Sequence, residues 1–442
     1  MFVIKKENVF ILLSIIVALF IFQGCAASRL DRAQSSVRNG FVSGDYENTA
    51  KLIEHYDKKN IYKERDKVLM LLEKGTALHF AGAYDSSFVA FEQAEKEMDR
   101  LFSKSISRGI ASFMINDNIL AYNGEDYESI YLNALNSLNY LHRKNYEDAL
   151  VEARQIAYKL QRLNIKYQGI VTALSEADTN NQVKWKSGKA NIQNSTFGHF
   201  LSGVLYARTG HPDDARIEYE QMLKAFNNQS SFFPYTSSGS ETLSRLKQPD
   251  QYNTLFVCFS GEAPVKYQVD TRVYLQREDF YLKLSLPVLR TVPSNVYSVY
   301  ALINDTLRIP LYKIENMDEV AMEVYKVKEP IIYARTFVRA LAKATGTNIT
   351  KAKLKKGGIK ILSGIVNLFG KIATEATEKA DLRSWQTMPG QVYVNLYKLP
   401  AGTHKLTIEY VSYNGRLLFE DHKKITIAND KALEVAESLF SN

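Results

Sequence analysis

The sequence predicts an α+β protein, in which an all-α helical repeat solenoid is followed by a mixed, mostly antiparallel β-sheet domain with helices. Two observations predict this class. Small and aromatic residues recur at helical spacing between residues 37 and 250, and Val-, Tyr- and Leu-rich runs broken by prolines begin at Asn253. We therefore expect a helical domain at 37–250 and an α+β domain at 251–442, preceded by a targeting segment.

The first 24 residues have the anatomy of a bacterial secretory signal peptide. Lys5 and Lys6 precede an apolar run from Val9 to Phe22, which stops just before Cys25. As a helix the run would be about 21 Å long at ~1.5 Å per residue, which is shorter than the ~30 Å core of a bilayer. We expect a cleaved signal rather than a retained membrane span.

Gly24-Cys25 after an apolar run resembles the lipobox of bacterial lipoproteins, although Phe22-Gln23 departs from its preference for Leu and then a small residue. The resemblance implies that Cys25 is acylated and becomes the N-terminus, with residues 25–36 as a tether. Acyl chains at ~0.8 kcal/mol per buried CH₂ would hold the protein on a membrane leaflet. Ala26, where an Asp would suggest inner-membrane retention, favours the outer membrane. The alternative is a secreted chain with a chance cysteine.

Composition limits the partners but does not select one. The net charge is +8 and is spread along the chain, which fits anionic lipid, cell-wall polymer or an acidic protein equally well. No nucleic-acid-binding motif accompanies it. With Cys25 lipidated, Cys258 has no cysteine to pair with, so no disulfide framework is expected.

Two stretches of the helical half share one spacing of small and aromatic residues, and two others share part of it. The full copies are Gly75, Leu78, Gly82, Tyr84, Ser87, Phe91, Ala94 and Gly203, Tyr206, Gly210, Pro212, Ala215, Tyr219, Met222; the partial copies are Gly44, Tyr46, Thr49 and Tyr140, Lys144, Tyr146, Ala149, Ala153, Ile156. The pattern resembles the tetratricopeptide repeat (TPR), an antiparallel helix pair in a solenoid. The copies are unequally spaced, so we expect insertions at Ile106–Tyr122 and Asp178–Thr196.

A solenoid groove would bind a partner through polar residues on its inner helices. Asn133, Asn136 and Asn139 follow one another at helical spacing, flanked by Tyr131 and Tyr140, and could clamp an extended peptide. The alternative is that these amides satisfy polar groups between helices. On the following helix, Arg154 is a candidate contact residue or simply a solvated one.

The C-terminal half alternates strand-like runs with turns. We expect strands within 254–314 and 392–427, helices at Asp318–Val327 and Pro330–Ala344, a hairpin turn at Asn414-Gly415 and a closing helix at Lys431–Phe440. The lysine-rich stretch from Lys351 to Leu368 is interpreted either as a basic amphipathic helix on a membrane or partner, or as a helix under the sheet.

Catalytic patterns are not found in the sequence. The seven histidines form no HxxxH, HExxH or HxH pair, and no phosphate-binding glycine loop occurs. Ser244–Lys247 matches SxxK, but its companion motifs SDN and KTG are absent. We expect a non-enzymatic protein without metal or cofactor.

Two segments resemble one family of bacterial envelope lipoproteins with TPR-like N-terminal halves. They are Tyr122–Glu128 with Asn139–Leu141 and Ala149–Arg154, and Ala380–Trp385 with Met388-Pro389 and Leu399–Gly402. The resemblance implies an outer-membrane lipoprotein that acts as a scaffold near cell-wall synthesis or the flagellar envelope apparatus. Within the second segment, Arg383 and Trp385 are interpreted either as core anchors or as interface residues.

Together these inferences predict a lipid-anchored, periplasm-facing adaptor that binds an envelope protein or peptide. Formation of a homo-oligomer is compatible with this prediction. An alternative is a glycan- or nutrient-binding lipoprotein working with an outer-membrane transporter, in which Tyr131, Asn133, Asn136 and Tyr140 form a sugar platform.

Overall fold

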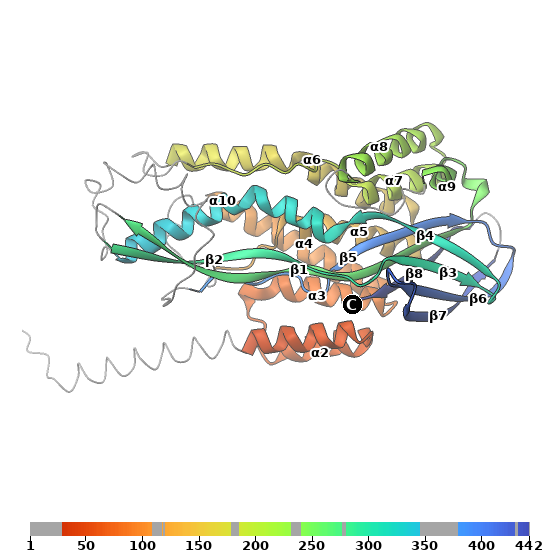
Figure 1. The fold of residues 1–442 in the computed structure, drawn as a ribbon, viewed down its shortest axis with the longest axis horizontal. Helices are drawn as coiled ribbons and strands as arrows, with labels where there is room; N and C mark the ends of the chain where they lie inside the picture. Colours follow the sequence, from red (N-terminus) through yellow and green to blue (C-terminus); the bar gives the residue numbers. More distant parts are fainter. Residues whose placement is uncertain are drawn as a thin grey trace, which may run out of the picture.

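The computed structural model describes residues 29–107, 117, 120–177, 185–230, 240–275, 280–344, 379–428 and 432–441. Helices fill the first half of this chain, and a curled, mostly antiparallel sheet fills the second (Figure 1). The predicted α+β class is therefore confirmed. The predicted signal peptide, Cys25 and the basic stretch Lys351–Leu368 lie outside the described residues.

Four helix pairs make up the helical half. They are residues 29–42 with α2 (Tyr46–Lys58), α3 (Lys67–Phe80) with α4 (Tyr84–Ser107), α5 (Asp126–His142) with α6 (Tyr146–Ala177), and α7 (Thr196–Arg208) with α8 (Pro212–Ser230). Successive pairs also contact each other, α2 on α3, α4 on α5 and α6 on α7. Short helical turns follow at η1 (Glu64–Asp66), α9 (Ser240–Leu243), η3 (Ser244–Lys247) and η4 (Pro249–Gln251).

The turns inside the four pairs are alike. The turn residues Gly44, Gly82, Lys144 and Gly210 have φ values of 79°, 77°, 60° and 83°. Each donates its N–H to the carbonyl three residues earlier, and the next residue donates to the carbonyl five residues before itself, as in Gly82 N to His79 O and Ala83 N to Leu78 O. A left-handed turn residue ends a helix in this way, which explains the recurring glycine.

Two glycines leave room for the side chains of neighbouring helices. A Cβ on Gly75 would lie 2.6 Å from the ring of Phe91, and one on Gly203 would lie 2.9 Å from Leu246. Either contact is shorter than real Cβ atoms tolerate, so the Phe91 ring or the Leu246 side chain would have to shift. These two glycines are therefore required by packing and not by φ.

The predicted tether of residues 25–36 is wrong from residue 29 on, because the first described residue, Arg29, is already helical. Leu30, Ala33, Val37 and Phe41 follow at helical spacing and are buried in the core. This apolar stripe packs the helix against its neighbours, so it cannot act as a free linker.

Eight strands are present in the described residues. They are β1 (Thr254–Leu275), β2 (Phe280–Val292), β3 (Ser298–Ile303), β4 (Leu307–Asn316), β5 (Pro389–Tyr397), β6 (Gly402–Val411), β7 (Leu417–Ile427) and β8 (Glu434–Phe440). Their order is β2-β1-β5-β4-β3-β6-β7, and β8 pairs with β1 in parallel. The first part of β1 pairs with β5 and β8, and after a register shift near Glu262 the rest forms a long hairpin with β2 (Figure 1).

Strand β1 separates two hydrophobic cores. Phe256 and Cys258 point into a smaller core inside the curled sheet, whereas Leu255, Val257 and Phe259 join the larger core, which also contains the helices. This alternation follows from the two-residue period of a strand. The two predicted domains therefore share one core across the boundary at residue 250.

Two predicted elements differ from the structure. The expected closing helix at Lys431–Phe440 is the strand β8, because pairing with the edge of β1 outweighs the helix propensity of its Glu, Ala and Leu residues. The two helices expected on either side of Pro330 are one helix, α10 (Met317–Ala344), which packs on β2, β5 and α5. The predicted Asn414-Gly415 turn is present between β6 and β7.

Candidate functional site

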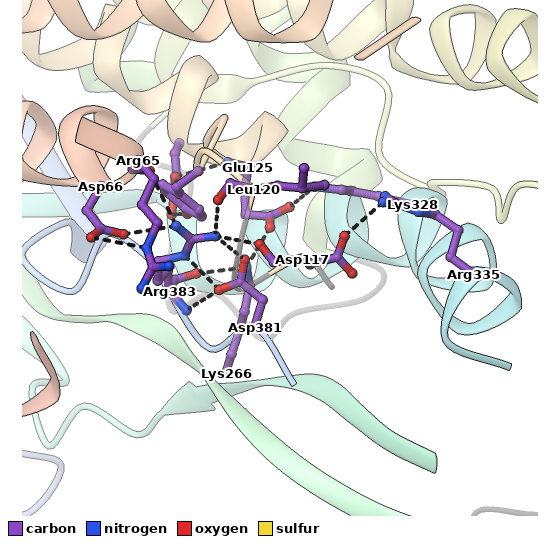
Figure 2. Close-up of polar contacts among 12 residues, drawn as sticks. Arg65, Asp66, Asp117, Leu120, Glu125, Lys266, Lys328, Arg335, Asp381 and Arg383 are labelled. Carbon is purple, nitrogen blue, oxygen red and sulfur yellow. Dashed lines mark hydrogen bonds and ion pairs between the residues drawn. The ribbon is translucent and has the colours of Figure 1, made fainter. Parts of the chain in front are cut away.

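Arg383 lies where the sheet meets the helical half, and its guanidinium is surrounded by acceptors (Figure 2). It donates to both carboxylate oxygens of Asp381 at 2.9 and 2.8 Å, to Asp66 Oδ1 at 2.9 Å, and to the carbonyls of Asp117 and Leu120 at 2.9 and 3.0 Å. Burial alone would lower the pKa of Arg383, but the two carboxylates outweigh it and raise that pKa. The side chain is 7% exposed, so it joins segments inside the protein.

Trp385 also joins the sheet half to the helical half, through a largely apolar side chain. It is fully buried, and its indole nitrogen donates to Thr76 Oγ1 on α3 at 2.8 Å and to Thr387 Oγ1 at 3.0 Å. Its ring meets Phe91 of α4 edge-on, with centroids 6.0 Å apart. Of the two interpretations offered by the sequence for Arg383 and Trp385, the structure fits core anchors.

The ionic network continues from Arg383 into β1 and α10 (Figure 2). Lys266 of β1 donates to Glu125 Oε1 at 2.5 Å and to the carbonyl of Arg383 at 2.8 Å, while Lys328 of α10 donates to Glu125 Oε2 at 2.9 Å. Burial would raise the pKa of Glu125, but the two ammonium groups lower it overall. We call the set Asp66, Asp117, Glu125, Lys266, Lys328, Asp381 and Arg383 the junction network.

Two carboxyl groups near the junction network have raised pKa values. Burial, and next the charge of Glu125, raise the pKa of Glu128 to about 7. Glu128 accepts from Tyr122 Oη at 2.7 Å and from the Trp385 amide at 2.7 Å. Burial likewise raises the pKa of Glu73 to about 7. Both side chains are 0% exposed, so this chemistry is enclosed by protein groups and not presented to a substrate.

The three asparagines predicted to line a groove are inside the helical half. Asn133 Nδ2 donates to Glu152 Oε2 at 2.5 Å, and Asn136 Nδ2 donates to the other oxygen of the same carboxylate at 3.3 Å. Asn139 Nδ2 donates to Ser87 Oγ at 3.0 Å. All three are at most 1% exposed. The alternative stated above, in which these amides satisfy polar groups between helices, matches this geometry and the open peptide clamp does not.

Tyr131 is also internal, because it binds a buried carboxylate. Its hydroxyl donates to Glu315 Oε1 at 2.8 Å, and Glu315 also accepts from Ser195 Oγ at 2.8 Å and the Phe197 amide at 3.2 Å. Glu315 lies at the end of β4 and thus supplies a negative charge at the N-terminus of α7, where backbone N–H groups are otherwise unpaired. Tyr140 is half-buried against Phe88.

A second polar cluster links α3 and α5 to β8, and sequence reasoning missed it. His79 Nε2 and His142 Nε2 donate to the two oxygens of Glu437 at 2.7 and 2.8 Å, and His79 Nδ1 donates to Asn139 Oδ1 at 2.8 Å. Tyr84 stacks on His142 with centroids 4.1 Å apart. We call His79, His142 and Glu437 the histidine clasp. Its members are far apart in the sequence, so no spacing signal announces it.

Charge holds the histidine clasp together. Burial would lower the pKa of His79, but Glu437 outweighs it and raises that pKa above its ordinary value. Burial would raise the pKa of Glu437, but His79 and His142 lower it strongly. Both nitrogens of His79 face acceptors, which is the arrangement that an imidazolium satisfies.

Among the candidate binding residues, Arg154 is the one with a solvent-exposed side chain, on the outer side of α6. A separate hollow of about 280 Å³ lies between residues 191–194 and α8, and is lined by Asn191, Gln193, Asn194, Lys224, Ala225 and Asn228. Its amide-rich wall offers both donors and acceptors to a ligand.

Within the described part of the chain, no group of three His, Cys, Asp or Glu side chains could hold a metal ion. In the same residues, no helix has both the length and the apolar character needed to cross a bilayer. Comparison of the chain with protein-family models, with curated proteins and with solved structures finds no match.

Proposed function

We propose that the protein is an outer-membrane lipoprotein that acts as a non-enzymatic adaptor in the bacterial cell envelope. In this proposal Cys25 carries the lipid, the body faces the periplasm, and a protein or peptide partner binds to the helical half. The four helix pairs with alike turns support a TPR-like repeat, whose usual work is protein binding.

The observation that carries the proposal is the position of the first helix. The chain from Cys25 to residue 29 spans at most about 14 Å at ~3.5 Å per residue. Residue 29 is already helical, and its helix is packed through Val37 and Phe41 into the core. A lipid on Cys25 would therefore hold the folded protein close to the bilayer, without a long flexible linker. A scaffold that works at the membrane surface requires such a position.

The internal networks support an adaptor in a second way. The junction network and the histidine clasp tie residues from α3, α5, α10, β1 and β8 into one body. Their polar groups are saturated by one another, so their role is structural. A partner is then left to the outer surface of the helices.

The test is to follow the protein in its own envelope. We expect metabolic labelling with a fatty acid to mark the wild-type chain and not Cys25→Ala, and the wild type to fractionate with the outer membrane. Crosslinking in intact cells should then recover an envelope protein complex. Unchanged outer-membrane fractionation of Cys25→Ala would refute the lipid anchor.

One observation favours the alternative of glycan or nutrient binding, although at a different place from the predicted platform. The amide-lined hollow beside α8 carries Asn191, Asn194 and Lys224. Amide groups of this kind bind the hydroxyl groups of sugars. A thermal-shift screen against a glycan panel tests it: stabilisation that Asn191→Ala and Asn228→Ala abolish would support this alternative, and no shift would remove it.

A further inference from the structure

Three large apolar side chains lie exposed in one line on α6. Val151, Tyr158 and Ile165 are 58%, 52% and 61% exposed and are spaced by seven residues. Seven residues are close to two helical turns, so the three lie on one face. At ~1.5 Å per residue the line is about 21 Å long. We call these three residues the α6 ridge; α6 runs along the upper edge of Figure 1.

The α6 ridge is not needed for the core. The buried stripe of the same helix is formed by Ala153, Ile156, Leu160, Leu163 and Tyr167, which face α5 and α7. An Ile and a Val that are more than half exposed contribute little hydrophobic stabilisation to the fold, and their apolar surface is open to a partner.

Cations flank the middle of the α6 ridge, whereas the exposed acids Glu147 and Asp148 lie beside its first residue, Val151. Arg154 and Arg162 lie four residues before and after Tyr158, and the Arg162 guanidinium is 5.3 Å from the centre of the Tyr158 ring. Neither arginine forms an ion pair within the described residues. By contrast, Lys159 and Lys166 of the same helix are paired with Glu95 and Asp126 at 2.6 and 2.5 Å. The positive charge beside Tyr158 is therefore available to an external anion.

We propose that the α6 ridge docks an amphipathic helix of a partner protein, with carboxylates of that helix facing Arg154 and Arg162. This inference rests on the proposed adaptor function and names the surface and the chemistry of its partner. Helices that pack along their length repeat their contacts every seven residues, with side chains at the flanks pairing by charge, and the α6 ridge supplies one apolar position of each such repeat. The partner is thus an acidic helix with an apolar seam.

Other occupants fit the α6 ridge less well. In an antiparallel second copy centred on Tyr158, Arg154 of one chain would face Arg162 of the other, so like charges would repel. The chain's own residues 345–378 include Lys351, Lys353, Lys355, Lys356 and Lys360, which would repel the same arginines. A helix lying on a membrane presents an apolar face about 100° wide or more, whereas this line is one residue wide.

A designed probe tests the charge and the seam together. The probe is a fluorescent three-heptad peptide with Leu and Ile in its seam and Glu at the flanking positions, and its twin carries Lys in place of Glu. Using the full mature chain and fluorescence anisotropy, we expect the acidic probe to bind at least about tenfold more tightly than the basic one. We expect Ile165→Asp to weaken acidic-probe binding at least about tenfold.

Matched variants separate docking from damage to the fold. Ile217→Asp replaces an apolar residue of α8 that is 44% exposed and lies off the ridge, and it should leave binding unchanged. The double variant Arg154→Glu with Arg162→Glu should reverse the preference, so that the basic probe binds more tightly. Equal binding of both probes, or an equal effect of the α6 and α8 variants, would overturn the proposal.

Crosslinking in cells identifies the natural occupant. A photoreactive residue at position 165 should capture a peptide that is acidic and has a seven-residue apolar period, and one at position 217 should not. Capture of lipid, of a second copy, or of a peptide without those features would overturn the proposal. Acylation of Cys25 is measured separately, so loss of the lipid anchor with probe binding intact would refute the anchor and leave the docking surface standing.

Discussion

Replacing Arg383 by alanine should lower the free energy of unfolding more than replacing any charged residue on the surface. The substitution removes the guanidinium that pairs with Asp66 and Asp381, and leaves Asp66 only the cation of Arg65, at 3.8 Å; it also removes the donor to the carbonyls of Asp117 and Leu120. Breaking a buried ion pair by removing one partner costs about 3–5 kcal/mol. Since whole proteins are stable by only about 5–15 kcal/mol, this loss is a large part of the total.

Two further variants make the reasoning specific. Arg383→Lys keeps the charge but cannot reach two carboxylates and two carbonyls with one ammonium group, so we expect an intermediate loss of about 1–3 kcal/mol. Arg216→Ala breaks an ion pair with Glu220 whose side chains are 54% and 50% exposed, and should cost about 0–1 kcal/mol.

Urea unfolding followed by circular dichroism measures all three variants at pH 7. The reasoning fails if Arg383→Ala loses less than about 1 kcal/mol, or no more than Arg216→Ala. In that case the guanidinium would not be holding the sheet to the helices.

Three other changes test separate parts of the structure. Glu437 raises the pKa of His79, so the histidine clasp contributes its full free energy of folding below the unfolded-state pKa of about 6.5. This contribution is lost as pH rises through the folded-state pKa of His79. The pKa of Glu437 is lowered, so the contribution of its charge is lost only in strong acid. The stability difference between wild type and Glu437→Gln should therefore be largest near pH 5–6 and shrink above pH 7, and a difference independent of pH would contradict an ionic clasp. Glu315→Ala leaves at least two buried donors without their acceptor and should lower the free energy of unfolding by about 2–4 kcal/mol, with Glu315→Gln losing less; equal losses would show that the charge at α7 is irrelevant. Gly188→Ala places a Cβ 2.0 Å from the Lys326 carbonyl oxygen of α10, so we expect a lower melting temperature. Gly169→Ala, inside α6 and with nothing within 4 Å of its Cβ, is the control and should keep or raise the melting temperature, because alanine favours a helix more than glycine.

Local patterns predicted the helices well because their signals lie within a few residues. The spacing of Gly82, Lys144 and Gly210 marked three helix-turn-helix units, since a left-handed turn residue is required at each. The same logic placed the Asn414-Gly415 hairpin. By contrast, residues 434–440 have helix-forming side chains and become a strand only because β1 has an edge to pair with.

The candidate site was harder to predict, because exposure is a tertiary property. The same helical spacing that suggested a clamp at Asn133 and Asn136 is also compatible with a buried ladder, and the choice depends on Glu152 approaching from another helix. Arg383 and Trp385 were recognised as important, but whether they face a partner or the core depends on Asp66 and Thr76, both more than 300 residues away.

By itself the sequence determined the α+β class, the helix pairs and their turns, and most of the strands, because periodicity and turn chemistry act over short distances. Only the tertiary structure decided which polar residues are buried, and that one core joins both halves across residue 250. It also exposed the α6 ridge, since a seven-residue apolar spacing acquires meaning only when the opposite face of the helix is seen to be buried. Burial and long-range pairing depend on contacts between segments that no local pattern encodes.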